Sequence, residues 1–309
     1  MVDVFLQTLP FFAIIGLGYL AGRTGFFPEA ATAYLTKFVF FFALSAMLFR
    51  FAANLSLSEV LNWQLIYAYL AGTGVIYIIA TAVAFARNQS TEVTAVEAQC
   101  AVIGNTGFLG IPMLALLMGP ESIGPLMLLL AVDLIVFSSL IVILINGSRD
   151  GRMSLAILRT VGIGLIKNPM IVSIVLGLTW SRMGWPVVAP IDQFLLVLGA
   201  AATPGALFAI GASLASKSAE RMHVATWLSF CKLILHPLAV AGFALFVFEL
   251  NAFEAAVIIA ASALPIAGNV FMLAQHYGVA PQRVSASILI STTLSIITFS
   301  IAIGWVALL

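Results

Sequence analysis

The chain has 309 residues, of which 62% are hydrophobic and only 8% are charged. A soluble domain carries about 25% charged residues, so this composition excludes a water-soluble globular protein and indicates an integral membrane protein. The formal net charge of +1, without a basic arm, argues against nucleic acid as a partner.

Ten apolar stretches are long enough to cross a membrane, which takes about 20 residues in a helix. In chain order they are 4–22, 34–53, 60–86, 98–120, 124–146, 168–184, 193–216, 223–248, 255–282 and 284–309. Their apolar runs are continuous, unlike the alternating pattern of a membrane β-barrel. The chain is therefore predicted to be an all-α polytopic membrane protein with ten transmembrane helices.

The sequence also repeats weakly at a spacing of 159 residues. This shift aligns Gly18 with Gly177 and Arg23 with Arg182. Five helices per repeat is an odd number, so the second copy is predicted to enter the membrane upside down, as in many carriers. The predicted units are a first repeat at 1–146, a cytoplasmic linker at 147–167 and a second repeat at 168–309.

Lysine and arginine residues in the short loops predict the orientation of these helices. If the N-terminus is outside, ten of them face the cytoplasm, and only Arg50 and Arg182 face out. Positive residues are enriched in cytoplasmic loops. Both termini are therefore predicted to lie outside.

Predicted helices four and nine are broken near their centres by residues that membrane helices avoid. A break leaves backbone groups unpaired, which is tolerable only where protein or a water-lined cavity satisfies them. Paired breaks in corresponding halves point to a transporter's binding site. The residues at the breaks are Asn105, Thr106, Gly110 and Pro112 in helix four, and Pro265, Gly268 and Asn269 in helix nine.

These residues are expected to have two kinds of role. Free N–H groups at a half-helix start attract a carboxylate, and Asn105, Thr106 and Asn269 add side chains that could bind it. The prolines and glycines are expected to keep the breaks open. The alternative is that Asn and Pro merely kink two helices.

Two charged residues are predicted deep in the membrane, Asp133 in helix five and Lys232 in helix eight. An unpaired charge there costs at least about 2.5 kcal/mol, so each must pair, change protonation or face a cavity. Lys232 could meet a substrate carboxylate, and Asp133 could carry a proton. A structural Asp133–Lys232 ion pair is the alternative. His236, directly before Pro237, could relay protons or serve packing.

Helices two and seven contain matched small-residue segments at 45–49 and 204–208. Small residues allow a helix or a substrate to approach closely, so Ser45 is a candidate ligand or a packing residue. No nucleophile elbow, phosphate loop or metal-binding motif is found. Neither an enzyme activity, a cofactor nor a metal site is expected.

The motif NTxxxGIP at 105–112 resembles the first crossover helix of the auxin efflux carrier family, and ALP at 263–265 resembles the second. This family lies within the bile, arsenite and riboflavin transporter superfamily. The resemblance covers essentially the whole chain. The short central loop is similar to that of bacterial members rather than to that of the plant hormone carriers.

The resemblance implies a scaffold of helices 1, 2, 6 and 7 and a moving transport domain of helices 3–5 and 8–10. It implies a secondary carrier in the bacterial inner membrane that moves a small organic anion, such as malate or malonate, by an elevator-like motion. Expected partners are this anion, membrane lipid, a coupling proton or sodium ion, and a second copy in a homodimer. The alternatives are a sodium-coupled bile-acid-like symporter and a ligand-binding membrane sensor that does not transport.

Overall fold

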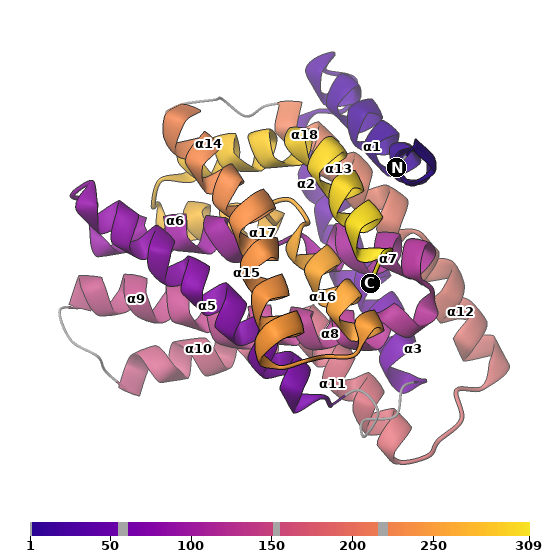
Figure 1. The fold of residues 1–309 in the computed structure, drawn as a ribbon. Helices are drawn as coiled ribbons and strands as arrows, with labels where there is room; N and C mark the ends of the chain where they lie inside the picture. Colours follow the sequence, from indigo (N-terminus) through magenta and orange to yellow (C-terminus); the bar gives the residue numbers. More distant parts are fainter. Residues whose placement is uncertain (1, 55–60, 151–154, 216–221) are drawn as a thin grey trace.

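The computed structural model describes residues 2–54, 61–150, 155–215 and 222–309 (Figure 1). In these residues the protein is built from helices joined by short turns. The one departure is a single antiparallel bridge between Gly104 and Ile266, where two helix breaks meet.

The first half of the chain is helical on both sides of its break. Short π-helical turns at Val39–Ala43 (η1), Thr106–Gly110 (η2) and Asp133–Phe137 (η4), and a 3-10 turn at Pro120–Ser122 (η3), connect several of its helices. The helices are α1 (Val2–Arg23), α2 (Glu29–Phe38), α3 (Leu44–Ala53), α5 (Trp63–Ala86), α6 (Thr91–Val102), α7 (Ile111–Met118), α8 (Ile123–Val132) and α9 (Ser138–Asp150).

The second half has the same character. Its π-helical turns are Cys231–Leu235 (η5) and Phe243–Val247 (η6). Its helices are α10 (Leu155–Lys167), α11 (Pro169–Arg182), α12 (Ala189–Ala200), α13 (Ala202–Ala215), α14 (Met222–Phe230), α15 (His236–Gly242), α16 (Ala252–Ser262), α17 (Gly268–Tyr277) and α18 (Pro281–Val306).

Six continuous helical segments of the described chain are long and apolar enough to cross a membrane, or seven if a pair bent by 70° counts as one span. They are Glu29–Ala53, Trp63–Ala86, Pro120–Arg149, Ala189–Ala215, Met222–Val247 and Pro281–Val306, with the bent pair Arg159–Lys167 and Pro169–Arg182. Shorter apolar helices flank the breaks, among them Thr106–Met118 and Ala252–Ser262. The protein is therefore an all-helical integral membrane protein.

Some helices begin earlier than the apolar stretches that predicted them. The fourth predicted helix begins at Thr91 rather than near 98, because the Ser90 side chain accepts a hydrogen bond from the Val93 amide at 3.4 Å and caps it. The second begins at Glu29 rather than near 34. An apolar stretch leaves out residues next to a charge. Such residues can still be helical when the charge lies at a helix end or is paired inside the protein.

Two glycines, one in each half of the chain, allow close contacts between helices. A methyl group at Gly18 in α1 would lie 2.1 Å from the Phe208 carbonyl oxygen in α13, and one at Gly177 in α11 would lie 2.7 Å from the Phe49 carbonyl oxygen in α3. The first pair of helices runs side by side in Figure 1. Both contacts bring backbones closer than any side chain would permit.

We expect Gly18→Ala to destabilise the protein by about 1–3 kcal/mol, because the added methyl group meets a backbone atom that cannot rotate away. Gly16→Ala is the matched control, since nothing lies within 4 Å of its added carbon. The apparent melting temperature in detergent measures both. Equal melting temperatures for the two variants would contradict the α1–α13 contact.

Candidate functional site

The two predicted helix breaks meet in the interior of the protein. The backbone N–H of Asn105 donates a hydrogen bond to the Pro265 carbonyl oxygen at 2.9 Å, and the backbone N–H of Ala267 donates to the Ile103 carbonyl oxygen at 3.0 Å. These bonds supply partners for backbone groups that the broken helices cannot pair internally. The breaks therefore form one crossover of two chain segments.

Side chains around the crossover support its two strands. The Ile266 amide donates to the Ser291 hydroxyl of α18 at 3.2 Å. Pro265 is buried and has no N–H to leave unpaired. A methyl group at Gly110 would lie 2.6 Å from Leu264 Cδ1, so the first break packs directly on the second. Pro112, in the first turn of α7, is partly buried.

Beyond the second break, the start of α17 faces open space. Gly268 is exposed, and a carbon added to it would find nothing within 4 Å. Asn269, the next residue, is half-buried, and its Oδ1 atom has no hydrogen-bond partner among the described residues. The first amides of a helix lack helical partners and carry partial positive charge, so this end can receive an anion.

Two predicted ligands in the first break are more enclosed than Gly268 and Asn269. Asn105 and Thr106 are both buried. The Asn105 backbone is engaged on both sides, because its N–H donates to Pro265 and its carbonyl oxygen accepts from Leu109 and Gly110. In the described part of the chain, the crossover thus leaves the Oδ1 atom of Asn269 without a hydrogen-bond partner and the Asn105 side chain buried at the other break.

A chain of buried polar side chains connects Lys232 with Asp133 beside the crossover. The Lys232 ammonium contacts the Ser262 carbonyl oxygen and lies 3.2 Å from His236 Nδ1. His236 Nε2 lies 3.0 Å from the Thr73 hydroxyl. The Tyr69 hydroxyl donates to Asp133 Oδ1 at 2.8 Å.

These contacts have a consistent direction. An ammonium group can only donate, so His236 Nδ1 accepts, and its Nε2–H then donates to Thr73. Tyr69, which donates to Asp133, lies one helical turn before Thr73 on α5. The Lys232–His236–Thr73 contacts and the Tyr69–Asp133 bond therefore meet on one helix.

The predicted alternative of a structural Asp133–Lys232 ion pair has no direct salt bridge in the described part of the chain. The salt bridges of the described residues do not include it, and each group has the other partners given above. The two charges still interact electrostatically. Their connection runs through α5, because Tyr69 and Thr73 lie between the helices that carry Asp133 and Lys232.

A second charged cluster was missed by the sequence analysis. Glu97 in α6 is fully buried and pairs with both Arg87 at the end of α5 and Arg283 in the first turn of α18. Arg283 also donates to the Gln89 side chain at 3.2 Å. The only signal in the sequence was that Glu97 directly precedes the predicted fourth apolar stretch, 98–120.

Ser45 is separate from the crossover chemistry. Its hydroxyl donates to the Phe40 carbonyl oxygen at 3.1 Å, five residues earlier in the π-helical turn. Ser138 makes the same kind of bond to the Asp133 carbonyl oxygen, also at 3.1 Å. Both hydroxyls satisfy carbonyls that a π-helical turn leaves without regular α-helical bonds. The described contacts of Ser45 are therefore structural.

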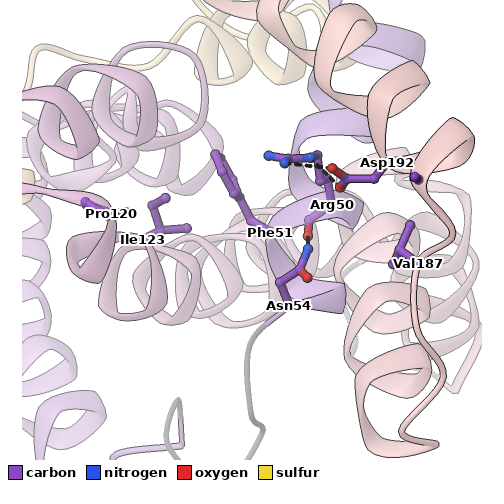
Figure 2. Close-up of a pocket in the computed structure, with 8 residues that line it drawn as sticks. Arg50, Phe51, Asn54, Pro120, Ile123, Val187 and Asp192 are labelled. Carbon is purple, nitrogen blue, oxygen red and sulfur yellow. Dashed lines mark hydrogen bonds and ion pairs between the residues drawn. The ribbon is translucent and has the colours of Figure 1, made fainter.

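A cavity of about 580 Å³ lies between two groups of helices (Figure 2). Arg50 of α3 and Asp192 of α12 form one wall, joined by two hydrogen bonds of 2.7 and 3.0 Å. Pro120 and Ile123, before and at the start of α8, line it as well. None of the crossover residues lines this cavity.

Comparisons with known proteins identify the family of the chain. The family model described as "Membrane transport protein" matches residues 3–303. A Rhizobium meliloti (strain 1021) protein with the name "Putative malonate transporter" is 27% identical over 96% of this chain and 94% of its own length. The "Uncharacterized transporter YfdV" of Escherichia coli (strain K12) is 28% identical over 94% of this chain and 93% of its own. Because the family match spans nearly the whole chain, this protein belongs to the membrane transport family of auxin efflux carriers and is a membrane transporter.

Proposed function

We propose that this transporter is a secondary active carrier of small organic anions of the carboxylate or dicarboxylate type. The observation that carries the proposal is the crossover, where two broken helices meet, Asn105 is buried at one break, and Asn269 Oδ1 near the other has no partner among the described residues. The exposed start of α17 adds helix N–H groups that suit a carboxylate. The relative named for malonate supports this substrate class.

The carrier would work by an elevator-like motion of an inverted repeat. The Gly177–Phe49 contact joins residues that lie 159 positions from Gly18 and Phe208, respectively. A contact that recurs with exchanged partners is expected when two repeats share one fold in opposite orientations. The proposed repeats are 1–146 and 168–309, with 147–167 as a cytoplasmic linker.

In this arrangement α1, α2–α3, α11 and α12–α13 would form the scaffold, and the remaining spans would carry the crossover. The Arg50–Asp192 cavity would then lie between scaffold and transport domain, because Pro120 and Ile123 belong to the latter. With both termini outside the bacterial inner membrane, this cavity would be on the outer side. The Arg50 charge, one of two predicted outside, is balanced there by Asp192.

Uptake of radiolabelled malonate into liposomes tests the proposed function. We expect the double variant Asn105→Ala/Asn269→Ala to lose transport at least about tenfold, because two polar groups at the bound carboxylate are removed. Ser45→Ala is the control, since its hydroxyl bonds within its own helix. Full uptake by the double variant would remove the crossover as the site, and binding without uptake by the unmodified protein would favour a sensor.

A further inference from the structure

Lys232 is a fully buried cation in the middle of the Met222–Val247 span. An ammonium group at such depth is costly unless protein groups replace its water. Its described contacts are the Ser262 carbonyl oxygen and His236 Nδ1. Both contacts come from the protein, which thus supplies acceptors for the ammonium group.

The carbonyl that receives Lys232 is at the end of a half-helix. Ser262 is the last residue of α16, which stops three residues before Pro265. The final carbonyls of a helix lack amide partners and carry partial negative charge. In carriers with broken helices, such carbonyl ends coordinate the coupling cation. Lys232 places an ammonium group where that cation would bind.

Gly104 on the opposite strand leaves the space that this ammonium group occupies. A methyl group at Gly104 would lie 3.2 Å from Lys232 Nζ and 3.4 Å from the Ala261 carbonyl oxygen. The ammonium group therefore sits between the two breaks, against both α16 and the strand of the first break. A cation here holds the two halves of the crossover together.

The charge of Lys232 is balanced within the same region. The titratable groups that interact with it are His236 on its own helix and Asp133 on η4. On the other elements packed against η5, the charged residues are Glu254 in the first turn of α16, Glu92 and Glu97 on α6, and Arg283 on α18, and the last two pair with each other. Asp133 carries the group of opposite sign that interacts with Lys232. A cationic and an acidic group of the protein itself are thus both present beside the crossover.

We propose that Lys232 is a built-in cation that occupies the position of a coupling sodium ion, so that the carrier operates without sodium. This inference builds on the proposed function and separates it from the sodium-coupled symporter alternative. It assigns Lys232 to positioning of the crossover rather than to direct contact with the substrate.

The test replaces the Lys232 ammonium group by a small cation from solution. In Lys232→Ala, the space left by the side chain should admit methylammonium or sodium. In Lys232→Met, an uncharged side chain of similar length fills that space. We measure melting temperature in detergent and malonate uptake in liposomes, in choline chloride, sodium chloride and methylammonium chloride. Lys167→Ala is the control, because Lys167 is exposed at the end of α10.

We expect the unmodified protein to behave alike in choline and sodium salts. Lys232→Ala should lose uptake at least about tenfold, and methylammonium or sodium, but not choline, should raise both its melting temperature and its uptake. Lys232→Met should stay inactive in every salt. The proposal is overturned if the unmodified protein requires sodium, if Lys232→Met transports normally, or if neither small cation affects Lys232→Ala.

Two features keep these outcomes interpretable. If Lys232→Ala does not fold, the proposal is still tested by the sodium dependence of the unmodified protein and by the activity of Lys232→Met. If the unmodified protein moves no carboxylate at all, the proposed function fails, while the response of the melting temperature to small cations still tests the role of Lys232.

Discussion

Glu97→Gln is expected to lower the free energy of unfolding by about 3–5 kcal/mol, the cost of breaking a buried ion pair by removing one partner. Glu97 is fully buried and balances Arg283, whose exposed fraction is 7%, together with the less buried Arg87. The variant keeps the size of the side chain but leaves two guanidinium groups without their carboxylate. The cluster also connects α5, α6 and α18, so its loss should loosen three helices around the crossover.

Glu92→Gln is the matched control for this experiment. Glu92 is also on α6 and also pairs with an arginine, Arg149, but both side chains are partly exposed. Water and salt screen such a pair, so its loss should have little effect. The apparent melting temperature in detergent compares the two variants. Similar decreases for both would contradict the assignment of Glu97 as the centre of a buried cluster.

Tyr69→Phe is expected to destabilise the protein by about 1–3 kcal/mol, because it removes the hydroxyl that donates to the buried Asp133 carboxylate. Since Asp133 Oδ2 already lacks a partner among the described residues, its carboxylate would lose its remaining side-chain donor. The change also interrupts the hydrogen-bonded chain from Lys232. If that chain carries the coupling proton, uptake by the variant should lose its dependence on a pH gradient.

Tyr67→Phe, two positions earlier on α5, controls for the loss of a hydroxyl. The Tyr67 side chain is 53% exposed, so its hydroxyl does not need a protein partner, and melting temperature and uptake should stay unchanged. If Tyr69→Phe shows the same pH-gradient dependence as the unmodified protein, the chain is structural and does not couple transport to protons. Asp133 would then serve to balance Lys232.

The helix breaks could be predicted from the sequence because proline, glycine and asparagine act locally. Pro265 cannot donate a helical hydrogen bond wherever it lies, so the end of α16 follows from the residues around it. The same local logic predicted that Asp133 and Lys232 need partners, because the cost of a buried charge depends only on depth. Glu97 was missed because a hydropathy window treats a charge as a boundary, whereas two arginines make this one compatible with burial.

The sequence by itself therefore determined that this chain is embedded in a membrane, where its two helices break and which buried charges need compensation. Only the tertiary structure decided which partner each of these groups has. Tyr69 and Asp133 are 64 positions apart, and Arg283 and Glu97 are 186 apart. Apolar helices carry no pattern that says which faces meet at such separations, because lipid and protein are almost equally apolar. Which helix faces meet is determined by the close packing of backbones and side chains.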